Sequence, residues 1–413
     1  MYALAIDLGT TTLAASLIEV ASGRRLAMTG SMNPQRRFGA DVVSRLDAAL
    51  HSSEALREMS LLIRAELWRL AGELCTITAI PWRDIGQVAI AGNPAMQHIL
   101  LGLPVRSLAL PPYRPVTTEG TTRRARDLGW EGDAEVYVFP MPGGFVGGDT
   151  VAFLLGAQPG DATLCLDMGT NGEIALVAGD TIWATSAAAG PAFEGGNLTC
   201  GMAALPGAVS SLCIKDDRLT LTVIGNGIPV GICGSAAIQT VAELSNLQII
   251  EPSGRLRDPG EISSNLATRV IRHNDESAFV LYRDAKCLLL LTQGDIRQIQ
   301  LAKGAIQAGI EVLADKASIQ VQALQDVILT GSFGAVLQPE WLKTIGVFDS
   351  NMVQMCRFTP EGALTGVERA IIAGDGFASA ERLGRQFRVI PLSGTPLFET
   401  LFIRHINFPE KDQ

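Results

Sequence analysis

The chain has 413 residues, of which 47% are hydrophobic, so it is long enough for two or three domains with sizeable cores. Its formal net charge of −9 argues against a nucleic-acid-binding protein, because phosphate backbones are bound by clustered Lys and Arg. No apolar stretch is long enough to span a bilayer, and the chain opens on strand-like sequence rather than on a signal peptide. We therefore expect a cytoplasmic protein that is not embedded in a membrane.

The cysteines and histidines show no metal-binding spacing. The seven cysteines include no Cys-x-x-Cys pair, and the four histidines lie far apart in the chain. An odd number of scattered cysteines is typical of a reducing compartment rather than of a disulfide framework. The sequence thus predicts no zinc site and no iron–sulfur cluster.

The first predicted elements are two strands joined by a short turn, Tyr2–Leu8 and Thr12–Val20, with a third strand at Arg24–Met32. The turn contains Asp7, Gly9, Thr10, Thr11 and Thr12. Glycine lets the backbone approach a ligand, and successive N–H groups with Thr hydroxyls form a concavity that binds an anion. The Asp carboxylate is a hard oxygen ligand suited to Mg²⁺, directly or through water.

The rest of the first half alternates helices and buried strands. An amphipathic helix is predicted over Glu54–Leu74, followed by strands at Gln87–Ala91 and Ala134–Phe139 that flank a polar insertion at Leu103–Glu131. Asn93 follows the first of these strands as a turn residue or a binding residue. Asp149 comes after four glycines at the start of a short helix. It is either a simple N-cap or the base that polarises an attacking water.

The second half repeats this plan after a boundary at Gly156–Asp161. Strands at Ala162–Asp167, Glu173–Ala178 and Thr181–Ala187 surround a second turn, which contains Asp167, Gly169, Thr170, Asn171 and Gly172. The same interval separates Asp7 from Asp167, Gly9 from Gly169 and Thr10 from Thr170. Two ordinary hairpins are the plain alternative, but the repetition favours two similar lobes whose turns clamp a polyphosphate from both sides.

Three further features of the second half are candidates for the same site. Glu194 lies on a glycine-rich loop and could contact metal or substrate. Lys303, on a helix that starts near Asp295, either contacts a nucleotide or is an ordinary solvated lysine. The strand Asp326–Thr330 ends in a small-residue turn that could approach an adenosine, consisting of Gly331, Ser332, Phe333 and Gly334. A closing helix is predicted over Thr365–Arg385, with strand or coil from Arg388 onward.

These motifs resemble the actin-like ATPase superfamily, which includes acetate and sugar kinases, heat-shock chaperones and actin. Residues 7–12 and 167–173 are similar to its two phosphate motifs, residues 329–334 to its adenosine motif and residues 147–155 to its connecting helix. The resemblance implies an α/β fold with two RNase H-like lobes around a nucleotide cleft. The lobes would span residues 1–158 and 159–413, with an inserted subdomain at about 197–325.

Within that superfamily the chain resembles the ATPase part of the reductive activators of corrinoid proteins. The likeness lies in five segments, residues 33–42, 92–98, 186–196, 231–235 and 301–306. It implies ATP and Mg²⁺ as cofactors, a corrinoid protein or related methyltransferase component as partner, and is compatible with a homodimer. Those activators carry a ferredoxin-like domain, whereas this sequence has no cysteine cluster. Either a separate ferredoxin-type protein donates the electrons, which we expect, or this homologue uses the same ATPase for another task.

The sequence thus predicts an ATPase whose β/γ-phosphates are held by residues 9–12 and 169–172, with Asp7 and Asp167 at the metal and with Asp149 and Glu194 as further catalytic candidates. Two alternatives remain. A small-molecule kinase of the acetate or sugar kinase type would transfer the phosphoryl group to a metabolite. A non-hydrolysing module would bind nucleotide without turnover.

Overall fold

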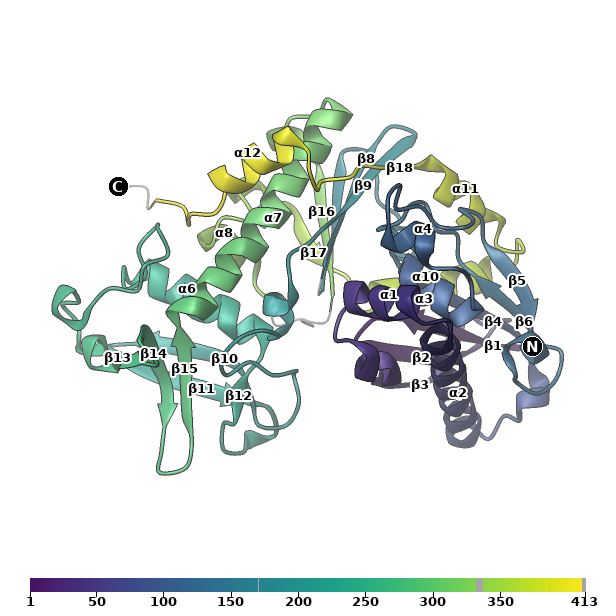
Figure 1. Ribbon diagram of the computed structural model, residues 1–413, viewed down its shortest axis with the longest axis horizontal. Coiled ribbons are helices and arrows are strands. Elements are labelled where there is room, and N and C mark those ends of the chain that lie inside the picture. The colour runs from purple at the N-terminus through teal and green to yellow at the C-terminus, as the bar shows by residue number, and fades with distance from the viewer. Residues whose placement is uncertain (170, 332–336, 411–413) are drawn as a thin grey trace. The chain divides into compact units, whose positions relative to one another are not determined.

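The computed structural model describes residues 1–169, 171–331 and 337–410 (Figure 1). The chain folds into two compact units. The first contains Met1–Gly160, Gly179–Ala184 and Glu361–Val389, and the second contains Asp161–Ala178, Thr185–Pro360 and Ile390–Gln413. Among the described residues, no helix combines the length and apolar composition of a membrane-spanning segment.

The first unit is built on a six-stranded mixed sheet of order β3-β2-β1-β4-β6-β5. Strands β1, β2 and β3 form an antiparallel meander, whereas β4 and β6 run parallel to β1, and β5 is an antiparallel edge strand. The sequence predicts five of these strands but not β5, which lies inside the predicted polar insertion. The bounds are β1 Tyr2–Leu8, β2 Thr12–Glu19, β3 Arg24–Met32, β4 Ile85–Gly92, β5 Thr121–Arg124 and β6 Glu135–Val138.

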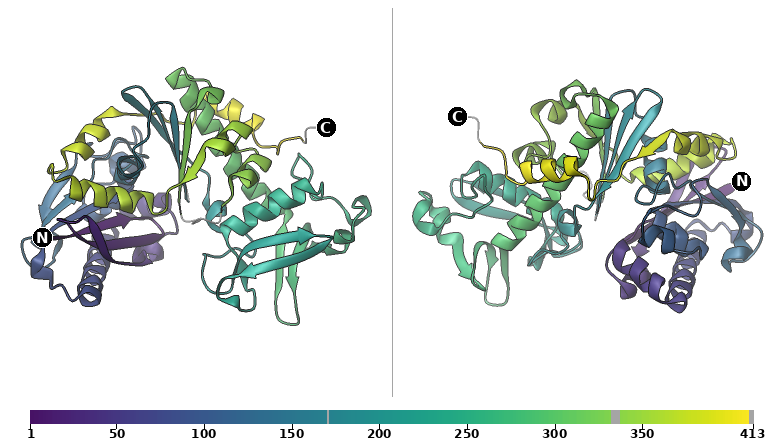
Figure 2. Two further views of the ribbon diagram at one scale, coloured as in Figure 1. Left: turned by 180° about the vertical axis from the view of Figure 1, so that it is seen from behind. Right: turned by 45° about the horizontal axis from the view of Figure 1, so that its top comes forward.

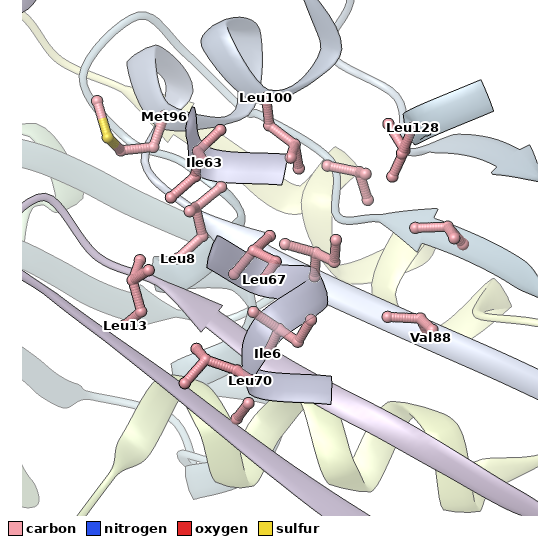
Figure 3. Packing of buried hydrophobic residues seen from close by; sticks show 14 of the residues in the cluster. Ile6, Leu8, Leu13, Ile63, Leu67, Leu70, Val88, Met96, Leu100 and Leu128 are labelled. Carbon is pink, nitrogen blue, oxygen red and sulfur yellow. The ribbon is translucent and has the colours of Figure 1, made fainter. Parts of the chain in front are cut away.

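Alternation along β1 divides its side chains between two packed faces. Leu4, Ile6 and Leu8 point into one core together with the helices α2 (Ser53–Thr78) and α3 (Pro94–Leu101), as Figure 3 shows. The predicted amphipathic helix is therefore confirmed as α2, and Ser52 caps it by accepting a hydrogen bond from the Ala55 N–H. The remaining short helices on this side are η1 Pro34–Phe38, α1 Val42–His51 and α4 Arg106–Ala109.

The helices α5 (Gly148–Ala157) and α10 (Gly362–Ala373) pack closely together, and both contact β4. A Cβ at Gly366 would lie only 1.6 Å from the Ala152 carbonyl oxygen, so the two backbones approach each other as only glycine allows. The predicted single helix over Thr365–Arg385 is wrong. α10 ends at Ala373, and a separate helix α11 covers Ala378–Gln386.

The break between α10 and α11 has a local cause. Gly374 and Gly376 have φ values of 65° and 63°, and Phe377 has a φ of 67°, so the chain leaves the right-handed helical region three times within four residues. The Phe377 ring then stacks on Tyr137 with a centroid separation of 3.9 Å. This contact offsets part of the cost of a left-handed aromatic residue.

The second six-stranded sheet repeats the plan of the first, in the order β17-β16-β7-β8-β9-β18. β7 pairs antiparallel with β8 and parallel with β16, as β1 does with β2 and β4. The repeated architecture predicted from the two similar turns is therefore confirmed. The bounds are β7 Thr163–Met168, β8 Gly172–Ala178, β9 Thr181–Ala187, β16 Asp326–Thr330, β17 Cys356–Phe358 and β18 Phe387–Val389.

Between β9 and β16 the chain forms two small sheets and two long helices (Figure 2). The sequence of this region predicts strands at Ala208–Ile214 and Leu219–Ile224 and helices that begin near Ser235 and Asp295. These are present as β10 (Ala208–Lys215), β11 (Arg218–Val223), α6 (Gly234–Asn246) and α7 (Gln293–Ala317). Four strands were not predicted, namely β12 Gly231–Ile232, β13 Val270–His273, β14 Glu276–Arg283 and β15 Leu288–Thr292.

The end of the chain is helical rather than strand or coil, so that prediction is wrong as far as Pro396–Arg404 is concerned. This helix, α12, packs on α7, because Phe398, Leu401 and Phe402 recur at helical spacing. Two short helices, α8 (Pro339–Thr344) and α9 (Ser350–Met355), precede it in the second unit.

Candidate functional site

The first turn joins β1 to β2 in a bend that requires glycine. A Cβ at Gly9 would lie 2.4 Å from the Thr12 carbonyl oxygen, which belongs to rigid backbone. The Nδ2 of Asn33 donates to the Gly9 carbonyl at 2.9 Å, and the backbone N–H of Asn33 donates to the Thr11 carbonyl at 2.9 Å. In a trans peptide the N–H points opposite to the C=O. The N–H groups of Thr10 and Thr12 therefore point away from Asn33.

A second asparagine reaches the same turn from the end of β4. Gly92 lies beside Leu8 in the parallel pairing of β1 and β4, so the residue after it is next to the turn. The Nδ2 of Asn93 donates to Oγ1 of Thr10 at 2.8 Å, while its Oδ1 caps α3 by accepting from the Met96 N–H. The turn is thus held from two directions by side chains from other strands.

The glycine-containing segment that precedes α5, residues 143–147, places Asp149 near this turn, within the first unit. A Cβ at Gly147 would lie 2.6 Å from the Asn93 Cα, and the Gly148 N–H donates to Oε1 of Gln97 at 3.1 Å. Burial raises the pKa of Asp149 from 3.8 to about 6, although the Thr150 N–H donates to its carboxylate. A carboxylate with such a pKa can exchange protons near neutral pH.

The second turn joins β7 to β8 in the second unit. Asp167 pairs with Glu173 across the hairpin and with Thr330 on β16. The Gly169 N–H donates to the Asn171 carbonyl at 3.0 Å, which makes the turn tight. A Cβ at Gly172 would lie 2.9 Å from Cγ1 of Ile306, so α7 packs against the end of the turn. Thr170 lies outside the described residues.

Two more predicted residues lie beside the second turn. Glu194 ends a short 3₁₀ helix, η4 (Pro191–Glu194), between Gly190 and Gly195, which both have positive φ. A Cβ at Gly169 would lie 3.6 Å from Oε1 of Glu194. A Cβ at Gly331, which has a φ of +132°, would lie 2.7 Å from the Met168 carbonyl oxygen. Ser332, Phe333 and Gly334 lie outside the described residues.

Lys303 is on α7 but its ammonium contacts the C-terminal segment. The residue is 2% exposed, its Nζ donates to the Asn407 carbonyl, and it lies 5.8 Å from the centroid of the Phe408 ring. Burial lowers the pKa of Lys303 to about 8. The α7 residue that touches the second turn is Ile306, one helical turn further along.

Asn33 is the supporting residue that sequence reasoning missed. Asn33 and Asn93 are each followed by a proline, and an asparagine before proline is a signal for a helix start. That signal predicts the caps but not the contacts to the turn. No group of three or more His, Cys, Asp and Glu side chains suited to a metal lies among residues 1–169, 171–331 and 337–410. Mg²⁺ is often held by only one or two carboxylates together with phosphate oxygens, so a turn that contains a single Asp still suits it.

Comparison with known proteins identifies two matching family models. One, described as the C-terminal domain of RACo, the ASKHA domain, matches residues 161–413. The other, described as the RACo middle region, matches residues 2–158. Together they account for nearly the whole chain.

Individual relatives agree with these models. The corrinoid activation enzyme RamQ of Eubacterium limosum is 30% identical over 418 residues, which cover 99% of this chain and 70% of RamQ. The reductase of a Co(II) methylated amine-specific corrinoid protein from Methanosarcina barkeri is 24% identical, covering 84% of this chain and 65% of the reductase. The solved structure of a reductive activator for corrinoid, iron-sulfur protein has a TM-score of 0.88 and 28% identity, covering all of this chain and 67% of that one.

The chain thus spans about two thirds of the length of these relatives. The α/β class and the actin-like ATPase fold predicted from the sequence are confirmed by the repeated mixed sheets and by these matches. The chain therefore belongs to the RACo family, is a homologue of corrinoid activation enzymes, and carries an ASKHA domain, the actin-like type of nucleotide-binding domain.

Proposed function

We propose that this protein hydrolyses ATP and uses the reaction to drive the reductive activation of a corrinoid protein. The observation that carries the proposal is the repeated strand–turn–strand unit, in which an Asp is the last residue but one of β1 or β7 and a glycine-containing turn follows. Family membership supports the choice of partner, since the relatives are described as activators or reductases of corrinoid proteins.

In this proposal the two turns bind phosphate oxygens of ATP. Thr10 and Thr12 contribute N–H groups that point away from Asn33, and Thr10 adds its hydroxyl. In the second turn the contributing residues are Gly169, Thr170, Asn171 and Gly172. Gly331, Ser332, Phe333 and Gly334 are the proposed contacts to the adenosine. Lys303 would contact the nucleotide only if its hydrogen bond to the Asn407 carbonyl opened.

Asp7 and Asp167 are the proposed Mg²⁺ ligands, directly or through water. The ion supplies positive charge that offsets the negative charge of the phosphates. Asp149 is the proposed base, because a carboxylate with a pKa near 6 is ionised at neutral pH and can accept a proton from the attacking water. Glu194, beside the second turn, is proposed to orient that water or a metal-bound water.

The electrons are proposed to come from an iron–sulfur protein or domain outside these 413 residues, whose seven cysteines include no Cys-x-x-Cys pair. One electron passes from that donor to Co(II), which becomes Co(I), while ATP and water give ADP and phosphate. A corrinoid protein, or a related methyltransferase component, is thus the proposed partner.

The test measures phosphate release and cobalt reduction in the same reaction. The purified protein is mixed with Mg-ATP, a reduced ferredoxin and a Co(II) corrinoid protein, and Co(I) formation is followed by its absorbance. We expect slow phosphate release that the corrinoid protein stimulates, and Co(I) only with ATP. A phosphorylated metabolite would instead indicate a kinase, and nucleotide binding with no turnover under any partner would indicate a binding module.

A further inference from the structure

Two asparagines of the first unit are used in the same unusual way. Asn33 follows β3 and Asn93 follows β4, and each is an N-cap with proline at the first helical position. The Oδ1 of Asn33 accepts from the Gln35 N–H at 2.9 Å, and that of Asn93 accepts from the Met96 N–H at 3.1 Å. Because the cap occupies the oxygen, each NH₂ group is directed away from the helix, and both reach the first turn.

Asn33 determines the direction of two peptide groups. It is fully buried, and it donates from Nδ2 to the Gly9 carbonyl and from its backbone N–H to the Thr11 carbonyl. These bonds occupy two carbonyl acceptors of the turn, those of Gly9 and Thr11. Since a trans peptide directs C=O and N–H to opposite sides, the exposed side of the turn is left with donors. Donors are what an anion requires.

Asn93 determines the polarity of the Thr10 hydroxyl. A threonine hydroxyl has one hydrogen and can both donate and accept, but an amide NH₂ can only donate. Oγ1 of Thr10 must therefore accept from Asn93, at 2.8 Å. Its own hydrogen then points elsewhere and is available to an oxygen of a ligand.

We propose that Asn33 and Asn93 are positioning residues that direct two N–H groups and one hydroxyl of the first turn toward phosphate. Neither side chain needs to touch the nucleotide, because each acts through the turn. The inference rests on the proposed binding of ATP and extends it, since it explains why two Asn–Pro segments far apart in the sequence accompany the Asp-x-Gly-Thr motif.

The test compares two substitutions that keep the cap of α3. Asn93→Asp retains an oxygen for the Met96 N–H but replaces the donor by an acceptor, so the Thr10 hydroxyl must donate to residue 93 rather than to ATP. Asn93→Ser also caps a helix, but its side chain is too short to reach Thr10. We expect Asn93→Asp to raise the Kd for Mg-ATP about tenfold or more, since hydrogen bonds to charged groups are the strong ones. Asn93→Ser loses the donor without adding an acceptor, so it should raise the Kd by a smaller factor, about threefold.

A double-mutant cycle identifies the route of the effect. The Thr10→Val variant lacks the hydroxyl, so adding Asn93→Asp to it should change the Kd for ATP much less than Asn93→Asp alone does. Both comparisons are made at high salt, where the added charge of Asp is screened. Asn33→Ser should weaken ATP binding about three- to tenfold and speed amide exchange in the turn, because the Gly9 carbonyl loses its donor. Ser52→Ala is the matched control, since it removes the cap of α2 in the same unit. It should lower the melting temperature and leave the Kd unchanged.

The outcomes separate this inference from the proposed function. If the wild-type protein binds no ATP, the proposed function fails and the inference fails with it. If the wild-type protein binds ATP but Asn93→Asp binds it equally well, or if Asn93→Asp and Asn93→Ser weaken binding to the same degree, the inference alone is overturned. A Kd change in Ser52→Ala as large as that in Asn93→Asp would also overturn it, because any lost cap would then suffice.

Discussion

The two turns occupy equivalent positions in the two sheets but are supported in different ways. The first turn is held by side-chain amides, those of Asn33 and Asn93, which come from other strands. The second turn is held by close packing that only glycine permits, at Gly172 against Ile306 and at Gly331 against the Met168 carbonyl. The repeated local sequence is therefore not accompanied by the same supporting contacts in the two turns.

The carboxylates around the turns also differ. Opposite Asp7 on β2 lies Ala14, whereas opposite Asp167 on β8 lies Glu173, whose Oε1 accepts from Oγ of Ser186 at 3.2 Å. Glu194 adds a further carboxylate beside the second turn. With Asp149 near the first turn, the first turn has two carboxylates among the described residues, Asp7 and Asp149, and the second has three, Asp167, Glu173 and Glu194.

The largest expected effects come from Asp7→Asn and Asp167→Asn. Each removes a proposed metal ligand while keeping the side-chain volume, and we expect corrinoid-stimulated phosphate release to fall about 10²- to 10³-fold, the loss typical of one removed electrostatic stabiliser. A larger loss for Asp167→Asn would sharpen the contrast between the turns. Asp47→Asn, at an exposed position on α1, is the control and should have wild-type activity. Wild-type turnover in either turn variant would remove that aspartate from the site.

Asp149→Asn should lower activity and raise stability at the same time. Without the proposed base, we expect phosphate release to fall about 10²- to 10⁴-fold. In the wild-type protein the rate should decline as pH falls through about 6, where Asp149 takes up a proton, and the variant should lack this decline.

The sign of the stability effect follows from the raised pKa. The folded state binds the Asp149 proton more tightly than the unfolded state. The contribution of Asp149 to the free energy of unfolding is therefore greatest below about pH 4 and decreases as pH rises to about 6. Above that pH the ionised, buried carboxylate destabilises the fold, and Asp149→Asn should add roughly 1–3 kcal/mol to the free energy of unfolding at pH 8. Chemical denaturation at pH 4 and pH 8 checks this, and an equal stability change at both values would contradict it.

Alanine substitutions at the turn glycines should destabilise the fold more where the added methyl group meets backbone than where it meets a flexible side chain. Gly9→Ala places a methyl group against backbone, at the Thr12 carbonyl, whereas Gly172→Ala meets the flexible Ile306 side chain. We expect Gly9→Ala to cost about 2–3 kcal/mol of folding free energy and Gly172→Ala about 1 kcal/mol, within the range for overpacking. Urea unfolding measures both, with Gly160→Ala, where a Cβ meets nothing within 4 Å, as the control. The reverse order would show that the first turn adapts more easily.

The smallest effect on nucleotide binding is expected for Lys303→Met. The ammonium is buried against the Asn407 carbonyl, so its removal should loosen the C-terminal segment and change stability by about 1 kcal/mol. ATP affinity should remain within about twofold, because the ammonium contacts the Asn407 carbonyl rather than either turn. A twofold change corresponds to about 0.4 kcal/mol of binding free energy. Isothermal titration with ATP, together with limited proteolysis of the C-terminus, checks both. A strong loss of ATP affinity would show that the lysine contacts the nucleotide.

Local patterns were sufficient for the framework of the fold. The apolar run Tyr2–Leu8 and the 3.6-residue spacing of α2 predicted elements that the structure confirms, because both patterns are set by neighbouring residues. The repeated Asp-x-Gly-Thr segments predicted the two matching sheets. Phosphate and metal binding by these residues stays a prediction that the experiments above address.

Features that depend on distant residues could not be predicted in this way. The break at Gly374–Phe377 is completed by a ring contact with Tyr137, more than two hundred residues earlier in the chain. Lys303 was a candidate ligand by its residue type, but packing of the chain's end directs its ammonium to Asn407. The pKa of Asp149 is likewise raised by burial, which no local motif encodes.

By itself the sequence determined that two strand–turn–strand units exist, where they lie, and which donor and acceptor groups they contain, since these are properties of contiguous residues. The tertiary structure alone decided which side chains support the first turn. Asn33 lies 24 positions from Gly9 and Asn93 lies 83 positions from Thr10. The pairing of β3 with β2 brings Asn33 to the turn, and the pairing of β4 with β1 brings Asn93 to it. Hydrogen bonds act over about 3 Å, so their partners are chosen by the folded chain rather than by sequence order.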